Sequence, residues 1–359
     1  MKKLLKIALL AVLALGFASC SDDDNNPNYT TDPNWVGGVY VISEGSYYNK
    51  IDGDLTNYDP IQRYVANGVF KAMNGRALAG TLNDGLVYGT KLYMTNTDEN
   101  VVEVAEAKTA KSVKQIQVNG PRCIKADGGF LYVTMFYENK VAKIDTTTYE
   151  VVATVETGTY PEGLAVLDGK LYVANSGYGS GNTVSVVDLA TFTTTNTLTV
   201  PTNPVDVMTD GTQLYLQCSG EYKADWSGYE VNPALYTLAT DGTTTKLAEA
   251  TISAIGPNRL YFIDYNYYKA SQTYGFVNLA DNKVETLSFS NQGVAAPFAI
   301  GVNPTNGDVY ITAYATTQTE EGYTLVDYSS NGFCVRYNSD GLQIDQFTVG
   351  LNPGTVIFY

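Results

Sequence analysis

The sequence predicts an all-β protein folded as a seven-bladed β-propeller, and three observations carry this prediction. An apolar residue, a tyrosine and another apolar residue recur together seven times, at intervals of 39 to 53 residues, which is typical of one four-stranded blade per repeat. Tight-turn sequences separate short alternating segments, as in antiparallel sheets. Sustained apolar spacings of three and four residues, which helices would show, are missing. The recurring tyrosines are Tyr40, Tyr93, Tyr132, Tyr172, Tyr215, Tyr261 and Tyr310.

Each repeat contains the same elements in the same order. A proline-led apolar stretch, such as Pro161-Glu162-Gly163-Leu164, predicts the inner strand of a blade. A turn such as Asp168-Gly169 leads from it to the strand that carries the tyrosine. Two alternating strands complete the blade, most clearly at Lys140–Asp145 and at 150–155.

The two ends of the repeat region predict how the ring closes. The first tyrosine strand, at Val39-Tyr40-Val41, lacks the proline-led strand found before the others. Residues 352–359 supply such a strand at the other end. Pairing the two leaves no open sheet edge at the junction. We therefore expect one domain over residues 35–359, with the C-terminal strand as the inner strand of the first blade.

The N-terminus predicts export and a lipid anchor. A basic start, an apolar run over residues 4–18 and small residues before Cys20 fit a signal peptide over residues 1–19, because the run is too short to span a membrane comfortably. A cysteine at this point is typical of bacterial lipoproteins, in which it is acylated. Phe17 stands where leucine is usual, and ordinary secretion with cleavage near Ala18 is the alternative.

The segment after the cysteine is read as a lipidated acidic tether over residues 20–34. Its start, Ser21-Asp22-Asp23-Asp24, resembles the acidic export signal that places lipoproteins of one phylum of gut anaerobes on the outside of the outer membrane. A solvated acidic linker is the alternative. Several acyl chains, at about 0.8 kcal/mol per buried methylene, would hold the protein stably. We expect a lipid-anchored protein at the cell surface.

Charge and the lack of histidine exclude several function classes. The chain has 22 basic and 37 acidic residues, and without Lys2, Lys3 and Lys6 it would have 19 against 37, a formal charge of −18. Such a surface repels phosphate backbones, so no nucleic-acid partner is expected. The chain has no histidine. A Ser-His-Asp triad and a histidine-ligated metal are therefore excluded.

The remaining cysteines and acids do not indicate catalysis. Beyond Cys20 there are Cys123, Cys218 and Cys334, an odd number in different repeats, which favours free thiols. Catalysis would need paired carboxylates, whose candidates are Glu44, Asp52, Asp54, Glu162, Asp206, Glu221, Asp225 and Asp264. Each is interpreted as a surface loop acid, so no enzyme and no catalytic residue is expected. The segment from Asp52 opens like a calcium loop but lacks its glycine and final glutamate, so no metal site is expected.

The two faces of the predicted ring differ in their loops. Turns between the first and second and between the third and fourth strands share one face and are short here. Loops between the second and third strands share the opposite face with the blade connections, and they are long and rich in tyrosine at 43–62, 218–233, 264–273 and 313–332. Tyrosine gives rigid contact area with a hydroxyl, as in binding loops. Ligand binding by this face is the hypothesis, and loop packing is the alternative.

Two repeats resemble a known family. Leu131-Tyr132-Val133-Thr134 and Leu171-Tyr172-Val173-Ala174-Asn175-Ser176, followed by strands with Asp145 or Asp188, resemble the YVTN family of β-propeller repeats. Together with the lipoprotein signal, the chain is similar to the BtuG family of cobalamin (vitamin B12)-binding surface lipoproteins. The resemblance implies that the loop-rich face captures cobalamin and passes it to a TonB-dependent outer-membrane transporter, BtuB.

Ligand identity stays open between three classes. A corrinoid can be held by its amide rim and nucleotide loop without a histidine on cobalt, so no cofactor is required and cobalamin would be the bound ligand. A glycan, whose rings stack on aromatic side chains, is the main alternative. A docked protein partner is the third.

The expected ligand site lies at the channel mouth on the tyrosine-rich face. Arg122 would meet a ligand phosphate or an acidic partner there, or form a salt bridge with Glu162. The expected ligand-binding residues are Arg122, Tyr137, Tyr160, Glu162, Tyr178, Asp206, Tyr222, Trp226, Tyr265, Tyr267, Phe298 and Tyr314.

Overall fold

The computed structural model describes residues 38–266, 271–290, 294–318 and 324–359, which belong to one compact unit, Asn34–Tyr359. The signal peptide, the acidic tether, the lipidation site Cys20 and the binding candidate Tyr267 lie outside the described residues.

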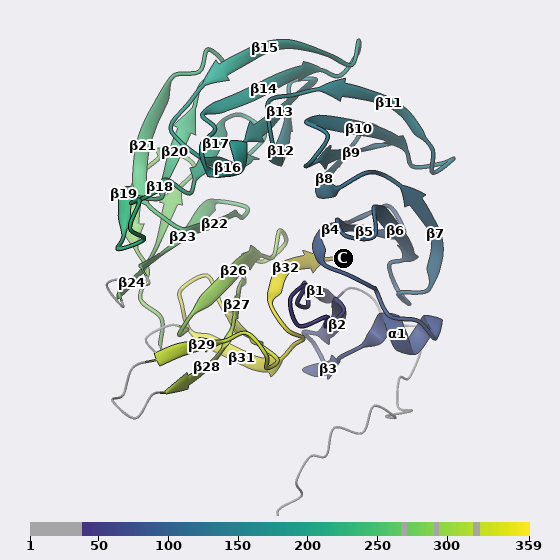
Figure 1. The fold of residues 1–359 in the computed structure, drawn as a ribbon. Coiled ribbons are helices and arrows are strands. Elements are labelled where there is room, and N and C mark those ends of the chain that lie inside the picture. Colours follow the sequence, from purple (N-terminus) through teal and green to yellow (C-terminus); the bar gives the residue numbers. More distant parts are fainter. Residues whose placement is uncertain (1–37, 267–270, 291–293, 319–323) are drawn as a thin grey trace, which may run out of the picture. The chain divides into compact units, whose positions relative to one another are not determined.

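The predicted seven-bladed β-propeller is confirmed: seven four-stranded antiparallel sheets form a ring in the described part of the chain (Figure 1). From the inner to the outer strand, blade 1 is β32 (Pro353–Phe358), β1 (Val39–Ser43), β2 (Asp54–Asp59) and β3 (Tyr64–Ala66). Blade 2 is β4 (Leu82–Tyr88), β5 (Lys91–Asn96), β6 (Val101–Glu106) and β7 (Ser112–Gln117). Blade 3 is β8 (Pro121–Asp127), β9 (Phe130–Met135), β10 (Lys140–Asp145) and β11 (Val151–Glu156).

The other four blades repeat this order. Blade 4 is β12 (Pro161–Leu167), β13 (Lys170–Asn175), β14 (Thr183–Asp188) and β15 (Thr193–Thr199). Blade 5 is β16 (Pro204–Thr209), β17 (Leu214–Cys218), β20 (Ala234–Leu238) and β21 (Thr244–Glu249). Blade 6 is β22 (Ile252–Ile255), β23 (Arg259–Asn266), β24 (Ser271–Asn278) and β25 (Val284–Thr286). Blade 7 is β26 (Pro297–Val302), β27 (Val309–Ala313), β30 (Phe333–Tyr337) and β31 (Gln343–Thr348).

The C-terminal strand closes the ring as the sequence predicts. β32 pairs antiparallel with β1, with Val39 opposite Phe358, and Figure 1 shows the two ends of the colour scale side by side. The pairing extends one residue beyond the strands, since Gly38 N donates to Tyr359 O at 2.9 Å. Tyr359 also stacks on Tyr40 at a centroid distance of 4.6 Å. Blade 1 is thus assembled from both ends of the propeller.

The recurring tyrosines form the joints between blades. All seven are at most 2% exposed, and all except Tyr40 pack in hydrophobic clusters that also contain residues of the next blade. Tyr40 of blade 1 donates its hydroxyl to Ala107 O of blade 2 at 2.8 Å. Tyr215 of blade 5 donates to Asn282 Oδ1 of blade 6 at 3.1 Å. The repeated phrase therefore encodes both the second strand and its contact with the neighbouring blade.

Several loop elements were not predicted. The connection from blade 1 to blade 2 contains a six-residue helix, α1 (Val69–Asn74), flanked by left-handed Gly68 and Gly75. A 3₁₀ turn, η1 (Gly177–Gly179), follows β13. Two extra hairpins, β18 (Glu221–Tyr222) with β19 (Tyr229–Val231) and β28 (Ala315–Gln318) with β29 (Thr324–Asp327), stand in the second-to-third-strand loops of blades 5 and 7. Among the described residues, every helix falls short of the length and apolar character that a bilayer span requires.

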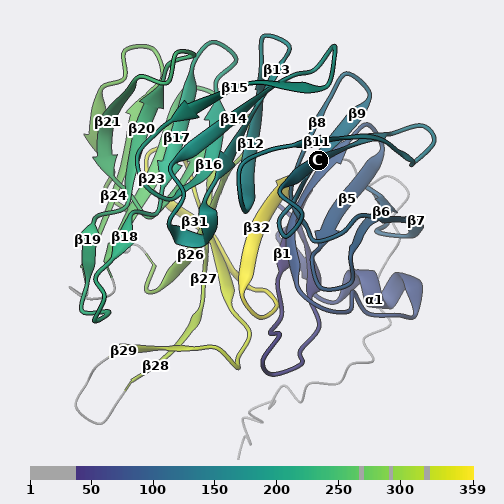
Figure 2. The same ribbon diagram turned by 45° about the horizontal axis from the view of Figure 1, so that its top comes forward.

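The two faces of the ring are unequal. Figure 2 shows both extra hairpins and the loop from β1 to β2 extending from the same side of the ring. We call this side, with its second-to-third-strand loops and blade connections, the loop face. The opposite side, made of the short turns within blades, is the turn face.

Candidate functional site

Exposed aromatic side chains concentrate on the loop face. Eight large aromatic side chains of the described residues are strongly exposed, and seven of them are in second-to-third-strand loops. The seven are Tyr47, Tyr48, Tyr137, Tyr178, Tyr222, Trp226 and Tyr328. Only Tyr64, at the start of β3, belongs elsewhere. Exposed aromatic side chains that gather on one face indicate a binding surface, whereas single scattered ones are normal on any protein.

A repeated backbone junction shapes the rim of the channel. The residue before the first proline of an inner strand is left-handed in several blades, including Tyr160 with φ 51° and Asn203 with φ 58°. Its carbonyl accepts an N–H from the residue just after the second strand: Ser176 N donates to Tyr160 O at 3.1 Å. A bulky residue such as tyrosine is uncommon in this conformation and persists only where its surroundings fix it. The junction thereby holds Tyr160 beside η1.

An ion pair joins blades 3 and 4 at this rim. Arg122 Nε of β8 lies 3.0 Å from Glu162 Oε2 of β12, and Ser176 Oγ lies 3.5 Å from Glu162 Oε1. Burial raises the pKa of the Glu162 carboxyl, and Arg122 opposes this. The structure contains the salt bridge that was one of the two expected roles of Arg122. Its Nη1 and Nη2 have no hydrogen-bond partner among the described residues, so the outer edge of the guanidinium can still donate to a ligand.

A cluster of four aromatic rings begins at this ion pair, and Phe136 is the ring that contacts Arg122. The Arg122 guanidinium carbon lies 5.1 Å from the centroid of the Phe136 ring. Phe136, which is 6% exposed, contacts Tyr137 at 5.1 Å and Tyr160 at 5.0 Å between centroids. Tyr160 contacts Tyr178 at 5.4 Å. The outer rings are left open, Tyr137 at 67% and Tyr178 at 78% exposed. The structure thus brings together five predicted site residues. It adds Phe136, whose buried ring contacts Arg122, Tyr137 and Tyr160.

Carboxyl groups near the ring axis are less exposed than the sequence suggested. Burial raises the pKa of Asp206, on β16, to about 6, although Lys125 opposes this. Burial also raises the pKa of Glu44, directly after β1, to about 7, against the nearby Arg122. The interpretation of Glu44, Asp54, Glu162 and Asp206 as surface loop acids is wrong, because all four are half-buried. Three of them are on, or directly after, the inner pair of strands, where the blades converge.

The other acids of that set differ from one another. Asp52, Glu221 and Asp225 are exposed as expected, whereas the interpretation of Asp264 as a surface loop acid is also wrong, because it is half-buried on β23. Asp54 accepts N–H groups from Leu55 at 2.7 Å and Gly68 at 3.1 Å, so it anchors the start of the connection to blade 2.

Sequence reasoning missed Asp84 of β4. Its Oδ2 accepts Ile124 N of blade 3 at 3.0 Å, and burial raises the pKa of its carboxyl, which Lys125 opposes. Asp84 follows the first residue of its inner strand by two positions, as Asp206 does. Blade 2 begins with Leu82 instead of proline, so a search keyed on prolines passes over it. Counting back from the tyrosine of each repeat would have found the position.

The remaining predicted residues form two further groups. On the blade 5 hairpin, Tyr222 stacks on Tyr229 at 4.8 Å and contacts Trp226 at 5.4 Å. On blade 7, Phe298 packs on the half-buried Tyr314 at 4.6 Å. Tyr265 is also half-buried and packs against the core between blades 6 and 7.

The described residues contain no cluster of three or more Asp, Glu or Cys side chains arranged to hold a metal ion. Cys123, Cys218 and Cys334 are free thiols, as predicted. Burial raises the pKa of the Cys218 thiol to about 12 and that of Cys123 well above its ordinary value, so both remain protonated at neutral pH.

Comparisons with known proteins identify the fold. No protein-family model and no curated protein matches the sequence. A solved structure of a protein from Lactobacillus plantarum has a TM-score of 0.62 and 14% identity, over 90% of this chain and 100% of its own. A Bacteroides uniformis protein, provisionally described as a 6-phosphogluconolactonase, has 0.62 and 10%, over 90% and 99%. Kuenenia stuttgartiensis hydrazine synthase has 0.59 and 16%, over 77% and 89%. At such identities the likeness concerns the fold alone.

Proposed function

We propose that the protein is a lipid-anchored cell-surface propeller that captures a corrinoid on its loop face and passes it to a TonB-dependent outer-membrane transporter. One observation carries the proposal: the exposed aromatic side chains of the described chain gather on the same face as the half-buried charged groups at the channel mouth. The protein acts by binding and not by catalysis.

The chemistry of the loop face suits a large amphipathic ligand. A corrinoid has a broad, partly apolar macrocycle, amide groups around its rim and one phosphate. Tyr137 and Tyr178 offer rings to its apolar surface. The carboxyl groups of Glu44 and Asp206 can accept hydrogen bonds from amide N–H groups, and the free edge of Arg122 can donate to an amide oxygen or to the phosphate.

The absence of histidine makes the proposal specific. No imidazole of this chain can replace an axial ligand on cobalt. Binding would therefore rest on contacts with the macrocycle and its side groups, and the visible spectrum of cyanocobalamin should keep the form that it has in solution.

A titration tests the proposal directly. Cyanocobalamin is titrated calorimetrically into the full-length protein, with absorbance recorded in parallel, and a panel of oligosaccharides is run under the same conditions. We expect saturable cyanocobalamin binding without a change of axial ligation, and no saturable heat from the sugars. Failure of cyanocobalamin to bind would contradict the corrinoid assignment.

The anchor and the handover need their own tests. Cys20→Ser should release the protein from membranes, and neutral substitutions at Asp22, Asp23 and Asp24 should leave it lipidated but hidden from protease added to intact cells. Co-purification of the anchored protein with a TonB-dependent transporter is the expected partner result. Equal protease sensitivity of the acidic variant would contradict the export-signal interpretation.

A glycan is the second candidate, and the blade 5 hairpin favours it. Tyr222, Trp226 and Tyr229 form a short ladder of rings on an exposed hairpin, which is a surface on which sugar rings stack. Saturable binding of an oligosaccharide that is lost in Trp226→Ala, with no binding of cyanocobalamin, would select this candidate.

A further inference from the structure

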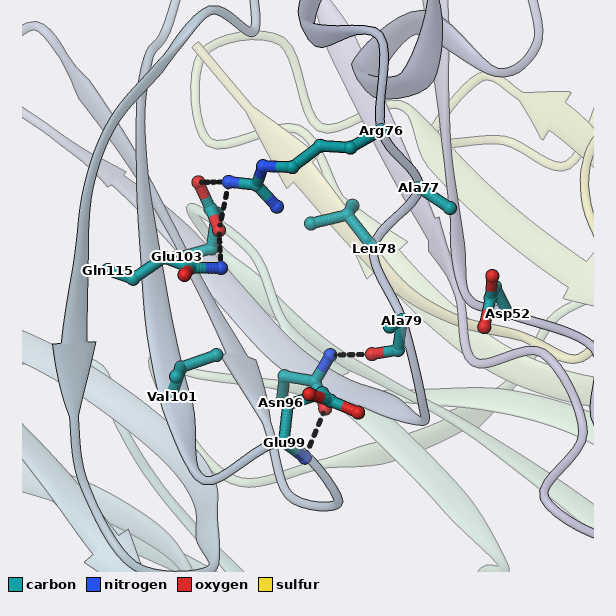
Figure 3. A pocket seen from close by; sticks show the side chains of 10 residues that line it. All are labelled: Asp52, Arg76, Ala77, Leu78, Ala79, Asn96, Glu99, Val101, Glu103 and Gln115. Carbon is teal, nitrogen blue, oxygen red and sulfur yellow. Dashed lines mark hydrogen bonds and ion pairs between the residues drawn. The ribbon is translucent and has the colours of Figure 1, made fainter.

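A pocket of about 390 Å³ lies between blades 1 and 2, and its lining shares no residue with the groups at the channel mouth (Figure 3). One wall is formed by residues 76–79 of the segment 76–80, which runs between the blades after α1. Gly53 N of blade 1 donates to Gly80 O at 3.0 Å, and Asn96 Nδ2 of blade 2 donates to Ala79 O. The segment is therefore held from both sides. Blades 3 and 4 are joined by the much shorter stretch 157–160, so the pocket depends on this longer connection.

The middle of the pocket is apolar. It is lined by Ala77, Leu78, Ala79 and Val101. Leu78 is 4% and Val101 6% exposed, so their positions are fixed by packing in the protein. Small aliphatic side chains without an aromatic ring suit a methylene chain better than a sugar ring.

At one end of the pocket, Arg76 forms an ion pair with Glu103 through Nη2 alone. Arg76 Nη2 donates to Glu103 Oε1 at 2.8 Å and Oε2 at 2.9 Å. The Glu103 side chain is 1% exposed. It also accepts hydrogen bonds from Ser112 Oγ at 2.5 Å and from Gln115 Nε2 at 2.9 Å. The carboxylate is thus satisfied by the protein. Nε and Nη1 of Arg76 have no hydrogen-bond partner within the described residues, and the side chain is 41% exposed.

The other end carries two carboxylates. Gly80 N donates to Asp52 Oδ1 at 3.3 Å, which places Asp52 beside the end of the segment (Figure 3). Glu99 N donates to Asn96 Oδ1 at 3.1 Å, and the Glu99 carboxylate has no partner in the described part of the chain. Both residues are exposed.

The charges of the lining set the kind of ligand. Glu103 balances Arg76, so Asp52 and Glu99 leave an excess of two negative charges. This excess attracts a cation and disfavours a free anion. A ligand with an ammonium at one end can meet Asp52 and Glu99, while an acceptor at its other end meets the free edge of Arg76.

We propose that this pocket is a second binding site, which takes a zwitterion whose ammonium and carboxylate are separated by a methylene chain. The ammonium lies between Asp52 and Glu99, the methylenes contact Leu78 and Val101, and the carboxylate accepts hydrogen bonds from Arg76. The site is independent of the ligand on the loop-face mouth, and it stands whether or not that ligand is a corrinoid.

A ligand series tests both ends without altering the fold. 6-Aminohexanoate, hexylamine and hexanoate are titrated calorimetrically into the full-length protein. We expect 6-aminohexanoate to bind most tightly, hexylamine about tenfold more weakly because it lacks the acceptor for Arg76, and hexanoate not at all. Absence of 6-aminohexanoate binding, or equal binding of hexanoate, would overturn the proposal.

Matched variants locate the site. Asp52→Asn and Glu99→Gln should each weaken 6-aminohexanoate binding about tenfold, because each removes a charge that carries no structural ion pair. Glu138→Gln removes an exposed carboxylate from the loop face of blade 3 and should leave binding unchanged. Unchanged binding in the Asp52 and Glu99 variants, or competition by saturating cyanocobalamin, would place the ligand elsewhere and overturn the proposal.

Discussion

Acidic residues in the turn-face loops and at the channel mouth have opposite pKa shifts. On the turn face, backbone N–H groups lower the pKa of Asp145, Asp188 and Asp241, as when Thr147 N and Thr148 N donate to Asp145 Oδ1 at 2.7 and 2.9 Å. At the mouth on the loop face, burial raises the pKa of Glu44 to about 7 and of Asp206 to about 6. The turn-face aspartates close turns, as Asp225 and Asp327 also do in the loop-face hairpins, whereas the mouth carboxyl groups are half-buried.

This difference separates structural acids from candidate functional ones. The turn acids are accounted for locally, because each stabilises the turn that contains it. The mouth acids carry a desolvation cost that the fold does not require, and titratable groups with such shifts concentrate at functional sites. The exposed aromatic side chains are on the same face as the second group. The comparison therefore supports the proposal that the ligand binds at the channel mouth of the loop face, and the variants below test it.

The largest expected effect concerns the closure on which both faces depend. Deleting residues 353–359 removes β32 and leaves β1 as an open edge in the middle of the ring. We expect the shortened protein to aggregate or to lose its cooperative melting transition, as measured by circular dichroism. Tyr359→Phe is the control, since it keeps the strand and the ring stacked on Tyr40 but loses the hydrogen bond from Asn57 Nδ2 at 2.7 Å. Equal melting of the shortened and complete proteins would contradict closure by β32.

The next effect compares one ion pair from each face. Arg122→Ala leaves Glu162 half-buried without its cation, and we expect a loss of about 2 kcal/mol in the free energy of unfolding. Lys91 and Glu106 are 2.8 Å apart at the turn face, and the Glu106 carboxylate is more exposed than that of Glu162, so Lys91→Ala should cost only about 0.5 kcal/mol. Urea denaturation measures both. Equal losses would remove the energetic distinction between the faces.

A third expected effect is a loss of ligand affinity at an unchanged stability of the fold. Trp226 and Tyr178 are 69% and 78% exposed, so alanine at either position should leave the melting temperature almost unchanged. If they are anchors, each substitution should weaken ligand binding by about 2 kcal/mol, or roughly thirtyfold. Leu342→Ala is the control, because Leu342 is 59% exposed in a turn-face loop. If Leu342→Ala weakens ligand binding and the two aromatic substitutions do not, the proposed binding face is wrong.

The fold could be read from the sequence because every blade repeats its signal. Tyr40 and Tyr310 occupy equivalent joints, so a weak pattern in one blade was supported by the others. The site could be predicted only in part, because its members come from loops that differ between blades. Arg122 and Glu162 were found through their prolines, whereas Asp84 follows a leucine and was missed. Burial of Glu44 depends on how the inner strands converge, which spacing along one chain does not encode.

The smallest effect is a pH dependence between pH 5 and pH 8, which comes from the acids at the channel mouth. The pKa of Glu44 rises from 4.5 to about 7 and that of Asp206 from 3.8 to about 6, so the folded protein retains protons that the unfolded chain has released. Their contribution to stability is complete below pH 4 and is lost as the pH rises through 6 and 7. Burial is the main cause of both shifts; Arg122 opposes it at Glu44 and Lys125 opposes it at Asp206, whereas Asp84 and Glu162 add to the rise at Asp206.

Glu44→Gln combined with Asp206→Asn should therefore reduce the difference in melting temperature between pH 5 and pH 8. Asp145→Asn is the matched control on the turn face. Because the pKa of Asp145 is lowered, its contribution is lost only as the pH falls below about 4, and it is constant between pH 5 and pH 8. Asp145→Asn should thus shift both melting temperatures equally and keep the wild-type difference. If the control variant flattens the profile and the double variant does not, the pKa contrast between the faces is wrong.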